Sequence, residues 1–259
     1  MTGPPPYPSG HGLLDGRVVV VTAAAGTGIG FATARRCAEE GATVVLSDHH
    51  DRRLGEAADT LAAEHGVRPL TVVCDVTRDD QVQALVDTAA AEHGGIDVMV
   101  NNAGLGGTVD LVDMTDEQWR SVLAVTLDGT FHCTRAALRH MVPRRRGVII
   151  NNASVIGWRA QAGQAHYAAA KAGVMALTRC AAIEAAPHDV RVNAVAPSLA
   201  MHPFLSKVTS EELLADLTQR EAFGRAAEPW EVANVVVFLA SDYASYMTGE
   251  VVSVSSQHP

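Results

Sequence analysis

Short apolar runs alternate with amphipathic stretches along almost the whole chain. The runs are rich in β-branched residues and mostly lack a period-2 pattern, which is typical of strands buried on both faces of a parallel sheet. They predict strands at 17–22, 42–48, 68–76, 97–103, 147–154, 191–197 and 250–256. The amphipathic stretches predict helices at 29–40, 51–65, 79–93, 116–141, 165–186 and 228–240. This regular alternation predicts an α/β fold, a doubly wound parallel sheet with helices on both faces.

The length of 259 residues suits one α/β domain, and the chain shows neither an internal repeat nor a linker. Residues 1–12 are rich in proline and glycine and predict a disordered N-terminal tail. Residues 13–259 are expected to form a single domain with an insertion near 199–222, in which 203–222 predicts a short helix.

Charge and composition exclude several kinds of partner. The formal net charge is −9 without a long basic run, which argues against nucleic acids and anionic membranes. The four cysteines form no C-x-x-C pair and the eleven histidines show no metal-ligand spacing, so no metal is expected. No stretch approaches the ~20 apolar residues of a membrane span, and the N-terminus lacks a secretory pattern. We therefore expect a soluble cytoplasmic protein.

Tyr167 and Lys171 lie four residues apart, and Ser154 lies thirteen residues before the tyrosine. On a helix, positions i and i+4 share one face, so Lys171 is expected beside Tyr167. A neighbouring positive charge favours the phenolate and would lower the pKa of the tyrosine, while the serine would hydrogen-bond a substrate oxygen. The alternative for an isolated Tyr-x-x-x-Lys is a buried tyrosine with a lysine that reaches to solvent.

A glycine-rich turn with Gly26, Gly28 and Gly30 follows the first predicted strand and precedes a helix. Glycines there allow the backbone to approach a pyrophosphate, which the helix N-terminus attracts. Asp48 ends the second strand, where a carboxylate can bind both hydroxyls of an adenosine ribose and repel a 2′-phosphate, so NAD is favoured over NADP. Asp48 could instead cap the following helix, and Arg52 and Arg53 complicate the prediction because arginine can bind a 2′-phosphate.

Two further motifs end predicted strands. Asp75 ends the third strand and could accept a hydrogen bond from adenine or cap a turn. "NNAG" (101–104) ends the fourth strand, at the edge where open α/β sheets bind ligands.

Together these motifs resemble the short-chain dehydrogenase/reductase family over residues 13–256, in the family's order. The resemblance includes "NAVAP" (193–197) and the segment from Phe223 to Glu250. It implies a Rossmann-like fold with seven parallel strands, a nicotinamide cofactor and a tyrosine-centred mechanism. It also implies a homotetramer or homodimer, with helices 116–141 and 165–186 building one interface.

The resemblance assigns roles to individual residues. Tyr167 becomes the general acid in reduction and the general base in oxidation, Lys171 lowers its pKa and holds the nicotinamide ribose, and Ser154 polarises the substrate carbonyl. The residues expected at the cofactor are Gly26, Gly28, Ile29, Gly30, Asp48, Asp75, Val76, Asn102, Ala103, Gly104, Tyr167, Lys171 and Pro197.

The chain departs from the family's pattern at four places. The glycine turn is one residue longer than usual, with Ala23 where the first glycine is expected. Thr126 occupies the position of the family's fourth catalytic residue, an asparagine that helps to build a water-mediated proton relay to the lysine. Ser198 follows Pro197 where the family has glycine, and His202 stands near a threonine that usually binds the nicotinamide carboxamide.

The substrate pocket is expected between residues 155–166 and the 199–222 insertion. Its predicted lining is Ser154, Trp158, Arg159, Gln164, Tyr167, His202 and Phe204. Arg159 could bind a carboxylate or a phosphate of a thioester carrier, or pair with an acidic residue at a subunit interface.

Three functions remain open. "NNASVIGWRAQ" and "VVSVSSQ" are most similar to bacterial family members of steroid-ring catabolism, which act on bicyclic ring acids, often as coenzyme A esters. The first hypothesis is therefore an NAD-dependent enzyme that interconverts a ring alcohol and its ketone. The second is a 3-oxoacyl thioester reductase acting on an acyl carrier protein or coenzyme A ester. The third is a non-catalytic nucleotide-binding regulatory protein.

Overall fold

The computed structural model describes residues 3–201 and 211–256. Within them, seven strands form one parallel sheet in the order β3-β2-β1-β4-β5-β6-β7. The strands are β1 (Val18–Thr22), β2 (Thr43–Asp48), β3 (Leu70–Val73), β4 (Val98–Asn101), β5 (Gly147–Asn152), β6 (Val190–Pro197) and β7 (Val251–Val254). The chain winds outward from β1 in both directions, so the predicted doubly wound, Rossmann-like sheet is confirmed.

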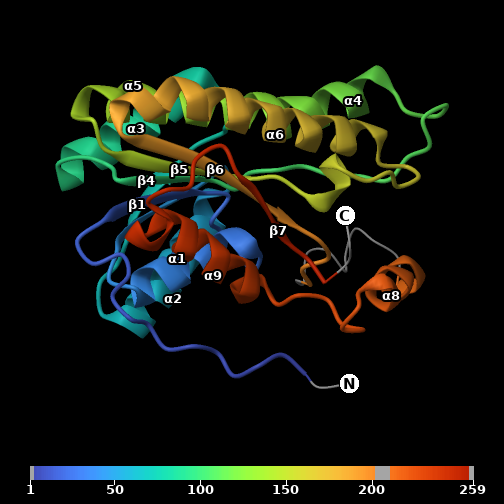
Figure 1. Ribbon diagram of the computed structural model, residues 1–259, viewed down its shortest axis with the longest axis horizontal. Helices are drawn as coiled ribbons and strands as arrows, with labels where there is room; N and C mark the ends of the chain where they lie inside the picture. The colour runs from blue at the N-terminus through green and yellow to red at the C-terminus, as the bar shows by residue number, and fades with distance from the viewer. Residues whose placement is uncertain (1–2, 202–210, 257–259) are drawn as a thin grey trace.

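Helices cover both faces of this sheet (Figure 1). On one face lie α1 (Ile29–Glu39), α2 (Asp51–His65) and α9 (Pro229–Ala240). On the other lie α3 (Asp79–His93), α4 (Asp116–Leu123), α5 (Gly129–Arg144) and α6 (Ala165–Ala185). The short helix α8 (Glu211–Arg220) stands apart from the two layers, near the end of β7.

The strand β1 shows why the apolar runs lack a period-2 pattern. All five of its residues are buried. Val19 and Val21 pack into the core cluster beneath α1, α2 and α9, whereas Val18 and Val20 pack into the cluster beneath α3, α5 and α6. Since neighbouring side chains on a strand point to opposite faces, two apolar cores require an apolar residue at every position.

The long helix predicted at 116–141 is divided in the structure. After α4, residues Ala124–Asp128 form a π-helical turn, and α5 then continues to Arg144. A π turn inserts one extra residue without interrupting the helical direction, so the pattern of apolar residues does not reveal it. The predicted strands at 68–76 and 250–256 are also shorter than expected. The predicted helix at 203–222 is described from residue 211 onward, where α8 lies.

The N-terminal segment lies against α1 and α9. The ring of Tyr7 packs edge-on against Trp230 with centroids 5.3 Å apart, and its hydroxyl donates to Glu39 at 2.7 Å. The buried Arg36 donates to the Pro8 carbonyl and, at 2.6 Å, to Glu40. Composition predicts disorder for residues 1–12, whereas residues 3–12 lie along these helices, where Tyr7 donates to Glu39 and the Pro8 carbonyl accepts from the buried Arg36.

The parallel strands bring their carboxyl ends to one edge of the sheet. Thr22, Asp48, Asn101, Asn152 and Pro197 end β1, β2, β4, β5 and β6 at this edge. The residues that the sequence singles out therefore meet where the loops leave the sheet.

Candidate active site

The glycine-rich turn connects β1 to α1 and is held close to β4. Gly26 has a positive φ of 123°, which favours glycine. A Cβ at Gly30 would lie 2.2 Å from the Ala23 carbonyl oxygen and 2.5 Å from Asn102 Nδ2, so only glycine fits there. Gly28 precedes the first turn of α1, whose unpaired N–H groups face the turn. This arrangement suits a pyrophosphate, which backbone N–H groups and the helix dipole stabilise.

Asp48 is 6% exposed and is held by backbone donors from two segments. Its Oδ2 accepts the Ala25 N–H at 3.2 Å, and its Oδ1 accepts the His50 N–H at 3.0 Å. Each carboxylate oxygen keeps acceptor capacity for one ribose hydroxyl. Burial raises the pKa of the Asp48 carboxyl above its ordinary value, and the hydrogen bond from Ala25 opposes this shift.

The alternative that Asp48 caps α2 does not match this geometry, because the N-cap residue of α2 is His50 and no side chain caps it. Of the two arginines that follow, Arg52 pairs with Glu56 at 2.6 Å on the exposed face of α2. Arg53 acts on Asp48 through its charge and lowers the pKa of that carboxyl.

The "NNAG" turn is fastened to the end of β1. Asn102 donates through Nδ2 to the carbonyls of Thr22 and Ala23, and the N–H of Ala103 donates to Thr22 Oγ1 at 3.2 Å. Asn102 Oδ1 accepts from Asn152 Nδ2 at 2.9 Å. These bonds fix the backbone from residue 102 to 104 beside the glycine-rich turn.

The region after β3 shows the turn-capping alternative for Asp75. Its Oδ1 accepts from the N–H and the hydroxyl of Thr77, at 2.9 and 2.8 Å. The buried Val76 accepts from His132 through its carbonyl and packs its side chain against Gly129. Asp75 is exposed at the same edge as Asp48, so the two predicted roles are compatible.

The structure brings Ser154, Tyr167 and Lys171 together. Lys171, which is 2% exposed, lies with its Nζ 5.6 Å from the centroid of the Tyr167 ring. A hydrogen bond links the Ser154 hydroxyl to the Tyr167 phenol. Ser154 Oγ also lies 3.4 Å from the Pro197 carbonyl oxygen, which brings the segment after β5 close to the end of β6.

Burial shifts both ionisable members of this group. It raises the pKa of Tyr167 to about 12, although the hydrogen bond from Ser154 acts in the opposite direction. It lowers the pKa of Lys171 to about 7. The predicted lowering of the tyrosine pKa by the lysine is therefore outweighed in this structure, because burial disfavours each charged form. A protonated Lys171 would still favour the phenolate, since it lies on the same face of α6.

Lys171 has an acceptor that the sequence does not reveal. Its Nζ donates to the backbone carbonyl of Asn152 at 2.5 Å. A backbone acceptor carries no signature in the residue type, so only the packing of α6 against β5 identifies it.

Thr126 lies in the π turn, is 0% exposed, and uses its hydroxyl twice. Oγ1 accepts the Leu105 N–H at 3.0 Å and donates to the Leu105 carbonyl at 3.1 Å. A Cβ at Gly104 would lie 3.5 Å from Lys171 Nζ and 3.9 Å from Thr126 Oγ1, so this glycine separates the two side chains. Thr126 thus fastens the loop after "NNAG" above the lysine.

The segment 104–110 lies beside the Tyr167 ring, and the sequence analysis assigned only its first residue, Gly104, to the site. A Cβ at Gly106 would lie 3.7 Å from the Tyr167 ring. Gln164 Nε2 donates to Thr108 Oγ1 at 3.1 Å, which connects this loop to the start of α6. The glycine pair Gly106 and Gly107, one residue after "NNAG", is the signal that could have identified it.

Trp158 and Arg159 follow the short 3₁₀ turn Val155–Gly157, and both donate their backbone N–H to the Val155 carbonyl. Trp158 is 43% exposed, so its ring is available to a flat apolar body. Two predicted pocket residues, His202 and Phe204, lie outside the described residues.

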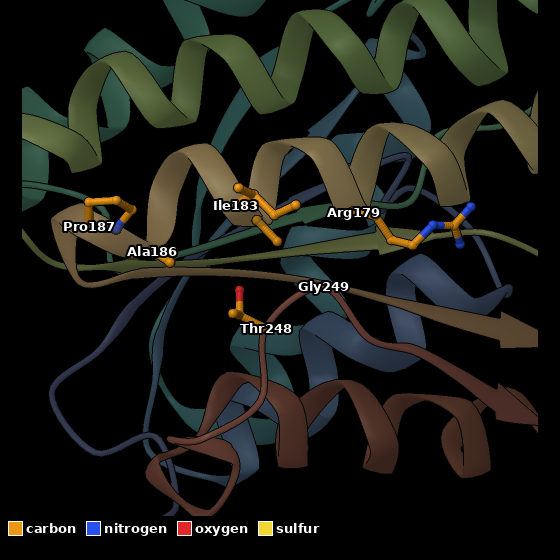
Figure 2. Close-up of a pocket in the computed structure, with 7 residues that line it drawn as sticks. Arg179, Ile183, Ala186, Pro187, Thr248 and Gly249 are labelled. Atoms are coloured by element: carbon orange, nitrogen blue, oxygen red, sulfur yellow. The ribbon is translucent and has the colours of Figure 1, made fainter.

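A cavity of about 510 Å³ lies elsewhere, at the other end of α6 (Figure 2). Its lining is Arg179, Ala182, Ile183, Ala186, Pro187, Thr248 and Gly249. Arg179 comes twelve positions after Tyr167 on α6, about 18 Å along the helix axis. This cavity is therefore separate from the catalytic group.

Across residues 3–201 and 211–256, no His, Cys, Asp and Glu side chains gather into a group that could hold a metal ion. In the same part of the chain, no helix is both long and apolar enough to cross a membrane.

Comparisons with known proteins find relatives that match nearly the whole chain. The family described as enoyl-(acyl carrier protein) reductase matches residues 23–256. A relative from Mycobacterium tuberculosis, named (5R,7aS)-5-hydroxy-7a-methyl-1-oxo-2,3,5,6,7,7a-hexahydro-1H-indene-carboxyl-CoA reductase, is 64% identical over 252 residues, covering 97% of this chain and 96% of that protein. A 3-oxoacyl-[acyl-carrier-protein] reductase from Thermotoga maritima is 41% identical, covering 93% and 97%. The crystal structure of a short chain dehydrogenase from Mycobacterium smegmatis is 59% identical, with a TM-score of 0.87 over 98% of each chain.

Proposed function

The chain belongs to the short-chain dehydrogenase/reductase family and is an oxidoreductase acting on CH–OH groups; from this premise we propose an NAD-dependent enzyme for a ring-bound secondary alcohol and its ketone. The observation that carries the proposal is the joining of Ser154, Tyr167 and Lys171 at the sheet edge where the glycine-rich turn and Asp48 also lie.

Tyr167 exchanges the proton in the proposed mechanism. In the oxidation, its phenolate oxygen takes the proton of the substrate hydroxyl, and in the reduction its hydroxyl returns that proton to the carbonyl oxygen. Ser154 donates a hydrogen bond to the same substrate oxygen. Lys171, when protonated, stabilises the phenolate. The nicotinamide, when bound, accepts or supplies the hydride at the carbon that bears this oxygen.

The choice of NAD rests on Asp48. Its buried carboxylate has acceptor capacity for two ribose hydroxyls and would repel a 2′-phosphate. A side-by-side binding comparison in which NADP bound more tightly than NAD at neutral pH would overturn this part of the proposal.

For the substrate, we propose a bicyclic ring alcohol or ketone with a carboxyl group as its coenzyme A ester. The 64% identity to the indene-carboxyl-CoA reductase supports this class, and the half-exposed Trp158 offers a ring surface four residues after Ser154. The 41% identity to a 3-oxoacyl-[acyl-carrier-protein] reductase supports a linear 3-oxoacyl thioester as the second candidate. NADH formation with hydroxy-indane carboxyl-CoA esters and with linear 3-hydroxyacyl-CoA distinguishes the two, because turnover of the linear substrate alone would refute the ring proposal.

We further propose that the enzyme is a homotetramer or homodimer. Trp119 and Phe131, on α4 and α5, are 37% and 40% exposed and offer apolar surface to a second copy. Light scattering after size exclusion measures the assembly, and a monomer at micromolar concentration would contradict this proposal.

The Tyr167→Phe variant tests the catalytic assignment. General acid–base catalysis contributes about 10²- to 10⁴-fold, so kcat should fall by about that factor while NAD still binds. Turnover is followed by NADH absorbance and binding by calorimetry. A variant that turns over at the wild-type rate would refute the mechanism, and a wild-type protein that binds NAD without turning over any alcohol would favour a regulatory protein.

A further inference from the structure

His49 lies against the carboxylate that the proposed function assigns to the adenosine ribose. Its Nδ1 is 3.3 Å from Asp48 Oδ1, and its side chain is 64% exposed. The rings of His49 and His50 stack with centroids 3.8 Å apart. An exposed imidazole is therefore in contact with the Asp48 oxygen that also accepts the His50 N–H.

The other ionisable groups around His49 are few. The glycine-rich segment from Ala24 to Gly28 carries no charged side chain. On α2, Arg52 pairs with Glu56, whereas Arg53 acts on Asp48 through its charge. The first turn of α2 also carries Asp51, and Asp75 follows the neighbouring strand β3.

The net charge at this edge changes when an imidazole gains or loses a proton. Imidazole is the side chain whose charge changes between pH 5 and 8. A neutral His49 adds no positive charge beside the carboxylate, which then repels a 2′-phosphate. A protonated His49 pairs with Asp48 Oδ1, competes with a ribose hydroxyl for that oxygen, and attracts a phosphate.

We propose that His49 makes the preference for NAD over NADP depend on pH, so that NADP binds relatively better when the imidazole of His49 is protonated. This inference rests on the proposed function, in which Asp48 binds the adenosine ribose. The contact of His49 Nδ1 with Asp48 Oδ1 is the observation that carries it.

The test compares cofactor binding by calorimetry at about pH 6 and about pH 8.5 in low salt, using the wild type and His49→Gln. The measured quantity is the ratio of the Kd for NADP to the Kd for NAD. The 2′-phosphate itself titrates near pH 6, but it does so equally in both proteins. When the pH is lowered from about 8.5 to about 6, the ratio should therefore fall about threefold further in the wild type than in His49→Gln. This size is what a solvent-exposed charge contact implies.

Two variants sharpen the comparison. His50→Gln removes the stacked ring but keeps the backbone N–H that binds Asp48, so it should behave like the wild type. His49→Lys carries a permanent charge and should show a low ratio at both pH values, without the additional fall. The difference between wild type and His49→Gln should shrink in high salt, because the charge lies at the surface.

An equal pH response of wild type and His49→Gln would overturn the inference, as would a loss of the additional fall in His50→Gln alone. Neither outcome touches the preference of Asp48 for NAD. Conversely, a wild type that binds NADP more tightly at about pH 8.5, where imidazole is neutral, would refute the proposed cofactor rather than the role of His49.

Discussion

Ala23 carries a positive φ of 49° where β1 enters the glycine-rich turn. This is the position at which the family resemblance expects a glycine. The left-handed conformation strains any residue with a Cβ, and here the strain accompanies the hydrogen bond from Asn102 to the Ala23 carbonyl. Alanine in place of glycine therefore raises the conformational free energy of the turn without changing the path of its backbone.

Ala23→Gly should stabilise the protein by about 1 kcal/mol, because it removes the strained Cβ and leaves the carbonyl in place. Urea unfolding at neutral pH measures the change. Ala25, in the same turn, has no positive φ, so Ala25→Gly is the control and should destabilise the protein by a few tenths of a kcal/mol. If Ala23→Gly destabilised the protein as much as Ala25→Gly does, the backbone of Ala23 would not be strained.

Lys171→Met should stabilise the protein, and more at low pH than at high pH. Burial lowers the pKa of Lys171 to about 7, so between about pH 7 and 10 the unfolded chain binds a proton that the folded protein does not. The stability of the wild type therefore rises with pH in this window, by at most about 1.4 kcal/mol per unit, and the advantage of the variant shrinks. Urea unfolding at several pH values measures the slope. Below about pH 9, where an ordinary tyrosine stays protonated, Tyr167→Phe retains the lysine and should keep the wild-type slope. A slope unchanged in Lys171→Met would contradict a lowered pKa.

At the scale of elements, the π turn between α4 and α5 is the feature that the sequence pattern could not predict. It places Thr126 where one hydroxyl satisfies both backbone groups of Leu105. Threonine replaces the asparagine that the family resemblance leads us to expect. Its hydroxyl is already hydrogen-bonded to the N–H and the carbonyl of Leu105. We therefore regard Thr126 as a positioning residue for segment 104–110 rather than as a member of a proton relay.

Thr126→Val should lower stability by about 0.5–1.5 kcal/mol, because it removes both part-buried hydrogen bonds to the Leu105 backbone. It should also lower kcat, since segment 104–110 lies on the Tyr167 ring. Thr126→Ser keeps the hydroxyl and should restore both properties. Urea unfolding and steady-state kinetics measure them.

Thr130→Val serves as the control for the π turn. It removes a hydrogen bond to the Thr126 carbonyl one turn further along, and it should lower stability while kcat holds. If Thr126→Val kept the wild-type kcat, the positioning role would be wrong.

At the scale of the whole molecule, the N-terminal segment joins two helices that lie far apart in sequence. Tyr7 contacts Trp230 on α9 and Glu39 on α1, and Arg36 of α1 also donates to Asn234 of α9 at 2.9 Å. The segment therefore reinforces the helix layer on the face of the sheet opposite α6, away from Tyr167.

Tyr7→Ala should lower the free energy of unfolding by about 1 kcal/mol, because the aromatic contact with Trp230 and the bond to Glu39 are lost. Tyr7→Phe keeps the aromatic contact and should lose less. Turnover at 25 °C should stay at the wild-type rate in both variants. Scanning calorimetry measures the stability, and an unchanged melting temperature in Tyr7→Ala would show that the segment does not support the fold.

The sequence by itself determined the alternation of strands and helices, the glycine-rich turn, Asp48, and the trio of Ser154, Tyr167 and Lys171. These features are readable because periodicity and motif spacing are local properties of the chain.

Only the tertiary structure decided the hydrogen-bond acceptor of Lys171, the two hydrogen bonds between Thr126 and Leu105, the contact of His49 with Asp48, and the packing of Tyr7 against Trp230. Three of these depend on backbone atoms or on segments that meet only after folding. The pKa directions of Tyr167 and Lys171 were decided in the same way, because burial, which has no signature in a four-residue spacing, outweighs their mutual attraction.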